Sequence, residues 1–193
     1  MARPKAFEPD TAVARALEVF WARGYDGTST QDLVDALQIN RSSLYGTFGS
    51  KRNLYHRALE RYGPVGASCL SRGLAGAGPL RVRLRRALLA IAETDLDAER
   101  ARGCFAANAA LELAPLDEDV RRLVAAAFAE NRAVLRAELE RAQAAGELDP
   151  EADADALAAF LSNTLQGLRV VAKGTGDRRL VEQAVDASLA ALR

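Results

Sequence analysis

The stretch NRSSLYGTFGSK, residues 40–51, combines a short helical pattern with a polar outer face. Leu44 and Phe48 are four residues apart, so a helix places both side chains on one buried side. Asn40 precedes this helix as an N-cap residue, and Gly49 follows it as a C-terminal stop. The side chains left facing outward are small, hydroxyl-bearing or able to donate hydrogen bonds; they are Arg41, Ser42, Ser43, Tyr45 and Thr47. Such a face is too polar to fill a core, which indicates that it binds a partner.

Helical patterns lie on both sides of this stretch. Residues 9–22 begin with a proline in the first turn and carry apolar side chains at helical spacing. Residues 28–37 begin with Thr28 and Gln31, which have the spacing of a capping box. Another helix is predicted from residue 51 to about residue 62. Two short helices joined by a tight connection, supported by a first helix, predict a helix-turn-helix.

Positive charge is concentrated around the opening stretch, although the whole chain is neutral with 26 Lys and Arg against 26 Asp and Glu. Residues 39–61 contain five cations and one anion. Short serine side chains let a helix approach the DNA major groove, where Arg41 can reach a guanine edge as a bidentate donor. Tyr45, Thr47 and Lys51 can donate to phosphates, which fixes the register on the duplex. We therefore expect this region to bind double-stranded DNA.

The segment GYDGTSTQDLVDALQINRSSLYGTFGSKRNLY, residues 24–55, resembles the DNA-binding signature of the TetR (tetracycline-repressor-like) family of transcriptional regulators. The similarity extends from Phe7 to Leu59. It rests on a set of paired positions, namely Gly24-Tyr25, Thr28-Ser29, Asp32-Leu33, Leu44-Tyr45 and Ser50-Lys51, together with Phe48.

This resemblance implies roles for individual residues. Thr28, Tyr45 and Lys51 correspond to positions that contact phosphates. The positions near base edges are Gln31, Arg41, Ser42 and Ser43. The family resemblance also implies a variable helical C-terminal domain that dimerises and binds a small-molecule effector, and a homodimer that binds a palindromic operator.

The rest of the chain favours an all-α fold, because alanine, leucine, arginine and glutamate dominate and strand patterns are weak. We predict an N-terminal three-helix DNA-binding domain over residues 1–50 and a C-terminal helical ligand-binding and dimerisation domain over residues 51–193. Residues 63–79 contain five glycines and two prolines, which predicts a loop with at most a broken helical stretch. This loop is either a connector or a mobile segment beside a pocket.

Five helical patterns follow this predicted loop, over residues 80–96, 103–114, 118–145, 151–173 and 177–192. The last two carry apolar stripes broader than one core-facing side needs. An antiparallel hairpin of these two helices can bury one face against its own chain and the other against a second copy, which predicts a four-helix dimer interface. Two copies can then read half-sites about 34–36 Å apart, or multiples of that spacing.

Six residues are candidates for effector binding, because they combine polar or aromatic side chains with apolar helix faces; they are Cys104, Phe105, Asn108, Phe128, Asn163 and Thr164. The alternative is that the polar ones are core groups with hydrogen bonds inside the protein. Cys104 is either a redox sensor, whose pKa Arg100 and Arg102 lower, or a buried inert thiol.

Several classes of protein do not fit the sequence. It has no run of 18 apolar residues and no signal peptide, and its two cysteines are too few for a disulfide framework. His56 is the only histidine, so we expect no metal site and no cofactor. We predict a soluble, cytoplasmic, non-enzymatic regulator, a repressor released from its operator by a small molecule. The alternatives are a small helical enzyme or carrier of an apolar metabolite, and a structural adaptor.

Overall fold

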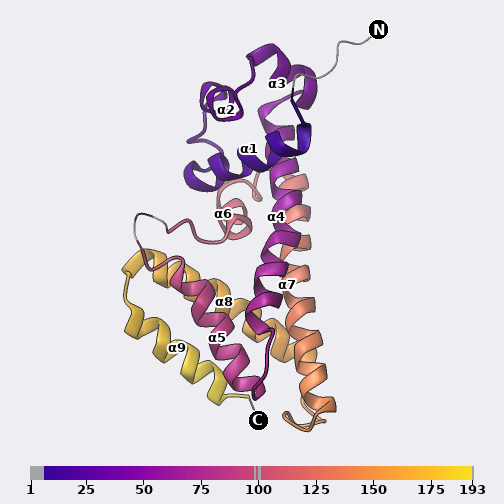
Figure 1. The fold of residues 1–193 in the computed structure, drawn as a ribbon, viewed down its shortest axis with the longest axis vertical. Coiled ribbons are helices and arrows are strands. Elements are labelled where there is room, and N and C mark those ends of the chain that lie inside the picture. The colour runs from indigo at the N-terminus through magenta and orange to yellow at the C-terminus, as the bar shows by residue number, and fades with distance from the viewer. Residues whose placement is uncertain (1–6, 98, 100, 193) are drawn as a thin grey trace. The chain divides into compact units, whose positions relative to one another are not determined.

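The computed structural model describes residues 7–97, 99 and 101–192, and within them it contains nine helices and no strand. The prediction of an all-α fold is therefore confirmed (Figure 1). None of the helices in these ranges combines the length and the apolar character that a membrane span needs.

The chain divides into two compact units. Unit 1 comprises Met1–Tyr62 and Phe105–Ala125, and unit 2 comprises Gly63–Cys104 and Ala126–Arg193. These bounds differ from the predicted division after residue 50, because two long helices are shared between the units and a later segment joins the N-terminal helices. Unit 1 holds α1 (Pro9–Arg23), α2 (Thr30–Leu37), α3 (Arg41–Phe48), α6 (Phe105–Glu112) and the first parts of α4 (Lys51–Leu74) and α7 (Glu118–Ala144).

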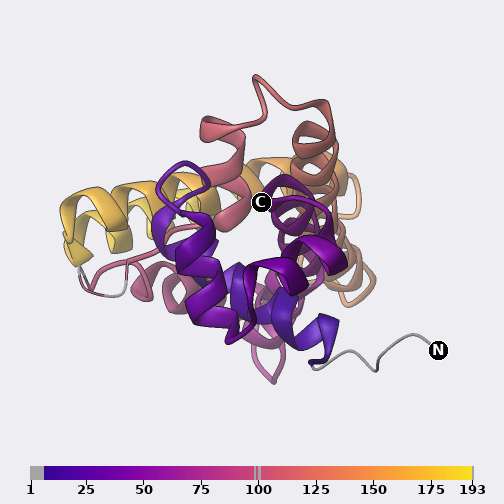
Figure 2. The same cartoon turned by 90° about the horizontal axis from the view of Figure 1, so that it is seen from above.

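Unit 1 is built around aromatic rings. Tyr55 of α4 lies at their centre, with its ring centroid 5.0 Å from that of Phe20, 5.2 Å from that of Tyr25 and 5.4 Å from that of Phe105. The three contacts are edge-to-face, which is a favoured geometry for aromatic pairs. The core therefore joins α1, α4 and α6. In Figure 2 the helices α1, α2 and α3 follow one another along the indigo-to-purple part of the ribbon.

The start of α2 differs from the predicted capping box by one residue. Ser29, not Thr28, is the N-cap: its hydroxyl accepts from the backbone of Asp32, whose carboxylate accepts from the backbone N–H of Ser29 at 2.8 Å. Thr28 is fully buried, and its hydroxyl donates to the carbonyl of Gly24 at 2.6 Å. Thr28 and Gln31 do not form the predicted capping box, because the Thr28 hydroxyl is buried and already bonded to the carbonyl of Gly24.

The prediction of a loop over residues 63–79 was wrong for most of that range, because α4 continues as a helix to Leu74 and passes through Pro64. Proline in a helix removes one backbone hydrogen bond, and this loss is offset where the helix packs well. Leu70 and Leu74 are buried in the core of unit 2. A Cβ at Gly73 would lie 3.1 Å from the Cβ of Ala87, so this glycine allows α4 and α5 to pack closely.

Unit 2 contains the remainder of α4 and α7 together with α5 (Leu80–Glu93), α8 (Ala154–Thr175) and α9 (Arg178–Ala190). Helix α5 packs against both α8 and α9, and α8 packs against α9 (Figure 1). The predicted hairpin of the last two helices is confirmed, and its turn is formed by Gly176 at φ 64° and by Asp177, which caps α9. Helices α4, α5, α7, α8 and α9 all contribute to one apolar core.

Candidate nucleic-acid interface

Helix α3 has the ends that the sequence predicts. The side-chain oxygen of Asn40 accepts from the backbone N–H of Ser43 at 2.7 Å, and Gly49 ends the helix at φ 76°. Leu44 and Phe48 are buried beneath it. On the outer side Arg41, Ser42 and Tyr45 are exposed, while Ser43 and Thr47 are half-buried. The helix therefore presents a hydrogen-bonding face on an apolar base.

Tyr45 is held in place by two neighbours. Its hydroxyl lies 3.3 Å from the hydroxyl of Thr30 at the start of α2, and the guanidinium carbon of Arg41 lies 5.8 Å from the centroid of its ring. The hydrogen bond with Thr30, followed by one with Arg41, lowers the pKa of Tyr45. Tyr45 still exposes 38% of its surface, so the hydroxyl can contact a partner. Thr30 was not among the predicted residues, although its position at the start of α2 could have indicated it.

Lys51 begins α4 directly after its capping residue. The hydroxyl of Ser50 accepts from the backbone N–H of Asn53 at 3.0 Å, which caps the helix. The Lys51 ammonium lies 4.1 Å from the centroid of the Tyr25 ring, a cation–π contact. This contact restricts the lysine to one region beside the end of α3.

Two of the predicted contact residues, Thr28 before α2 and Gln31 on it, already have partners inside the protein. The hydroxyl of Thr28 is buried against Gly24, so in this structure its side chain is not available to a phosphate. The amide of Gln31 is exposed and donates to the carboxylate of Asp35 at 2.8 Å. Gln31 can thus reach a partner only if it exchanges this bond.

An acidic residue of α6 supports the turn between α1 and α2. The carboxylate of Glu112 accepts from the backbone N–H of Tyr25 at 3.0 Å and from that of Asp26 at 2.8 Å. Charge-assisted bonds of this kind are stronger than neutral ones. The helix-turn-helix is therefore fixed from a segment more than 80 residues away, which local sequence patterns could not reveal.

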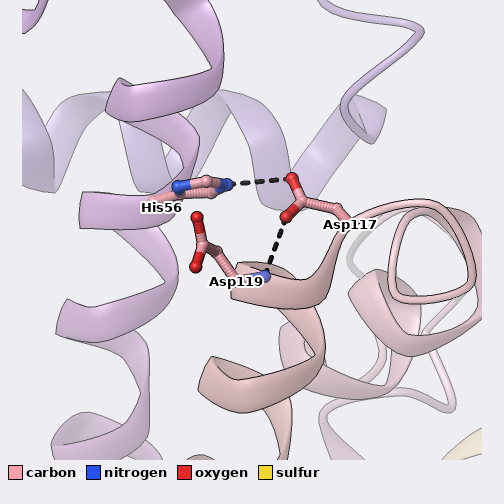
Figure 3. A group of neighbouring side chains, drawn as sticks. All are labelled: His56, Asp117 and Asp119. Carbon is pink, nitrogen blue, oxygen red and sulfur yellow. Dashed lines mark hydrogen bonds and ion pairs between the residues drawn. The ribbon is translucent and has the colours of Figure 1, made fainter.

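A second acidic residue fixes α4 to the start of α7. Asp117 is buried, and its Oδ2 lies 2.6 Å from Nε of Arg52 and 3.0 Å from Nε2 of His56. Its Oδ1 accepts from the backbone N–H groups of Asp119 and Val120 (Figure 3). The hydrogen bond from Arg52, with a further one from His56, holds the pKa of Asp117 well below its usual range.

The group His56, Asp117 and Asp119 has the residue types and the spacing of a cation site. Figure 3 shows His56 and Asp117 pointing toward each other, with the side chain of Asp119, from the first turn of α7, beside them. Both lone pairs of Asp117 Oδ2 are taken by Arg52 and His56, and the guanidinium would repel a metal ion. This arrangement is an ion-paired helix cap.

Two family models match the chain. One, described as bacterial regulatory proteins of the tetR family, covers residues 12–58, and the other, described as a tetracyclin repressor-like C-terminal domain, covers residues 78–188. The chain belongs to the TetR family. As a TetR-family chain it is a helix-turn-helix transcriptional regulator, which confirms the resemblance seen in residues 24–55.

Individual TetR-family relatives match the chain over most of its length. The uncharacterized HTH-type transcriptional regulator YezE of Bacillus subtilis is 34% identical over 193 residues, which is 100% of both chains. The HTH-type transcriptional repressor ComR of Escherichia coli is 31% identical over 172 residues, 89% of this chain and 82% of ComR. The regulator CifR, solved as a cysteine mutant with a 26-bp operator DNA, is 35% identical, with a TM-score of 0.84 and coverage of 100% of both chains.

The six candidate effector residues of this TetR-family chain are distributed over both units. Phe105 and Asn108 lie on α6 in unit 1, and the ring of Phe105 fills the aromatic core beside Tyr55. The four in unit 2 differ in exposure: Cys104 is buried, Phe128 and Thr164 are half-buried, and Asn163 is exposed. The prediction that the six share one site is untested.

Cys104 follows a backbone segment that is tightly held. Asp95 is buried, and its Oδ1 accepts from the backbone N–H of Gly103 at 2.8 Å while its Oδ2 accepts from Nε of Arg169 at 2.7 Å. Arg169 also donates to the carbonyl of Gly103 at 2.6 Å. Arg100, on which the redox prediction for Cys104 partly rests, lies outside the described residues.

Proposed function

We propose that the chain is a repressor that binds a palindromic operator as a homodimer and releases it when a small molecule binds to unit 2. It acts by binding and not by catalysis, in the cytoplasm where its operator is. The observation that carries the proposal is the outer face of α3, where Arg41, Ser42 and Tyr45 are exposed above the buried Leu44 and Phe48. A relative named as a repressor and a similar regulator solved on operator DNA support it.

Residues in the first turn of α3 contact the edges of the bases. Arg41 is exposed, and its guanidinium is placed near the Tyr45 ring. A bidentate contact from arginine to a guanine edge contributes about 1–3 kcal/mol of discrimination against the wrong base. Ser42 beside it is short, which lets the helix backbone approach the groove. These two residues therefore set which sequence is bound.

Residues at the edges of the same face contact the phosphates. The Tyr45 hydroxyl and the Lys51 ammonium can both donate hydrogen bonds to phosphate oxygens. In the free protein, Thr30 already restricts the position of Tyr45, and the Tyr25 ring restricts that of Lys51. A restricted side chain loses less conformational entropy on binding than a free one. These contacts set affinity and register without reading bases.

The dimer rests on α8 and α9. Phe160 and Val170 of α8 expose 41% and 60% of their surface, and Leu180 of α9 exposes 44%. Large apolar side chains exposed in series on a hairpin mark a surface for another protein. A second copy of the same hairpin covers them in a four-helix arrangement with two-fold symmetry.

A selection experiment tests the proposal. Purified chain is mixed with random genomic fragments, and bound fragments are sequenced. We expect one palindromic motif, bound by a species that sedimentation shows to be a dimer. Arg41→Ala should broaden the motif at one position in each half-site, whereas Arg15→Ala, an exposed arginine of α1, should leave it unchanged. Uniformly weak capture of all fragments at low salt would contradict DNA-specific function.

A further inference from the structure

Among the described residues of unit 2, three buried side-chain oxygen atoms have no hydrogen-bond partner in the structure. They are Oε2 of Glu130 and Oδ1 of Asn131 on α7, and Oε1 of Gln166 on α8. Asn131 as a whole exposes only 8% of its surface. Buried polar atoms are almost always paired, because an unpaired one forfeits its bond to water, so each such atom needs an explanation.

The positions of these residues place them beside the core of unit 2. Asn131 precedes Leu135 and Leu139 by one and two helical turns, and both leucines are fully buried in that core. Gln166 directly follows Leu165, which belongs to the same core. The three unpaired oxygens are thus shielded from solvent, and Asn131 lies on the same side of α7 as two leucines of the core.

Counted in residues along their helices, the two amides are similarly far from the segment that links α7 to α8. Asn131 lies 13 residues before the end of α7 at Ala144, and Gln166 lies 12 residues after the start of α8 at Ala154. At about 1.5 Å per residue these separations correspond to roughly 20 Å and 18 Å. The link itself is fixed, because the amide of Gln143 donates to the carbonyls of Asp149 and Ala152 at 3.0 and 2.8 Å.

Glu130 adds a carboxylate to this region. Its Oε2 lies 3.0 Å from the point where a Cβ of Gly63 would be, so the absence of a side chain on α4 leaves room for the carboxylate. All three unpaired atoms are acceptors, and one belongs to an acidic group. A molecule that satisfies them must donate hydrogen bonds, and a positive charge on it would be favourable.

We propose that Glu130, Asn131 and Gln166 form the polar part of the effector site and that the effector is an amine, with an apolar body and an ammonium or other N–H donor group. This inference rests on the proposed function, in which a small molecule binds to unit 2. An effector bearing a carboxylate or phosphate is excluded, because its charge would repel Glu130 and its oxygens cannot donate to the amide oxygens.

The first test uses two probes that share one apolar body. Binding of phenethylamine and of 3-phenylpropionate to the full chain is measured by calorimetry and by the thermal unfolding midpoint. We expect phenethylamine to bind and 3-phenylpropionate not to bind. Glu130→Gln should weaken phenethylamine binding by roughly tenfold or more, while Glu140→Gln, an exposed position of the same helix, should not change it. Equal binding of both probes, binding of neither, or stronger binding of the carboxylate overturns the proposal.

The second test needs no ligand. Asn131→Leu keeps the branching of the side chain and removes the unpaired oxygen, so we expect the ligand-free chain to unfold roughly 2–4 °C higher and to lose phenethylamine binding. Arg132→Leu, at an exposed position of the same helix, is the control and should do neither. A lower midpoint for Asn131→Leu would show that ordered water already satisfies the oxygen, and would overturn the proposal.

Operator binding, measured in parallel by fluorescence anisotropy, tests the proposed function independently of the amine site. If the unmodified chain binds its operator but binds neither probe, the amine site is wrong and the proposed function stands. If the chain binds no operator, the proposed function fails whatever the probes do.

Discussion

The carboxylate of Glu112 lies 3.0 Å from the backbone nitrogen of Tyr25 and so fixes the turn that leads into the helix-turn-helix. The same carboxylate also accepts from Asp26. Its oxygens would lie 3.0 Å from a Cβ at Gly24, a residue that adopts φ 74°. The turn is thus shaped around this acidic residue of α6, and glycine at position 24 allows both the conformation and the approach.

Removing this carboxylate should therefore weaken unit 1. We expect Glu112→Ala to lower the free energy of unfolding by about 2 kcal/mol, since it leaves two backbone donors without their charged acceptor. Urea unfolding followed by circular dichroism measures the change. Glu60→Ala, an exposed position of α4, serves as the control and should have little effect. Equal stabilities of the two variants would show that water replaces Glu112 without loss.

Asp117 should make stability depend on pH. Its folded-state pKa is lowered, first by the hydrogen bond from Arg52, so the unfolded chain takes up this proton at higher pH than the folded chain. The contribution of Asp117 is therefore complete above the ordinary carboxyl pKa of about 4 and decreases as the pH falls below it. We expect Asp117→Ala to cost about 2 kcal/mol at pH 7 and less at pH 3. Urea titrations at both pH values, with Asp119→Ala as the control, test this. If Asp117→Ala lowered the free energy of unfolding equally at both pH values, the ion-paired cap would be contradicted.

Tyr55 carries a buried hydroxyl that has no hydrogen-bond partner in the structure, and burial raises the pKa of this phenol. Tyr55→Phe keeps the ring contacts and removes the unpaired group. We expect its free energy of unfolding to equal or exceed that of the unmodified chain, by up to about 1 kcal/mol. Tyr55→Leu, which loses the edge-to-face contacts with Phe20, Tyr25 and Phe105, should instead cost about 2–4 kcal/mol. Destabilisation by Tyr55→Phe would reveal a bound water.

The salt dependence of operator binding should report the Lys51 contact. Each phosphate contact contributes a slope of about −0.9 to log K against log salt, so Lys51→Ala in both protomers should make the slope less steep by about 2. Lys173→Ala, in unit 2, should leave the slope unchanged. Fluorescence anisotropy over a salt series measures both. An unaltered slope for Lys51→Ala would remove this residue from the phosphate contacts, and the cation–π contact with Tyr25 would then be its whole role.

Local signals were sufficient to predict α3 from Arg41 to Phe48, because Asn40 and Gly49 mark its ends and Leu44 fixes its buried side. The same signals failed for α4. Glycine and proline lower helix propensity, but Leu70 and Leu74 are held in a core whose other residues come from α5, α7, α8 and α9. Propensity is a weak guide where tertiary packing supplies the stability.

The candidate site shows the same limit. The exposure of Arg41, Ser42 and Tyr45 follows from helical periodicity and was predictable. The two acidic residues that support it, Glu112 and Asp117, could not be predicted, because their hydrogen-bond partners are more than 60 positions away in the chain. A single sequence contains no local pattern that pairs an acidic residue of α6 with a backbone turn after α1.

The continuity of α4 and α7 has a consequence for cooperativity. Each of these helices has residues in both units and continues through the boundary, although Pro64 removes one backbone hydrogen bond of α4 there. Helix formation propagates along an unbroken backbone, so melting one half of such a helix frays the other. Although the chain has two cores, calorimetry should record one heat-absorption peak, with the same midpoint for the aromatic signal of unit 1 as for total helicity.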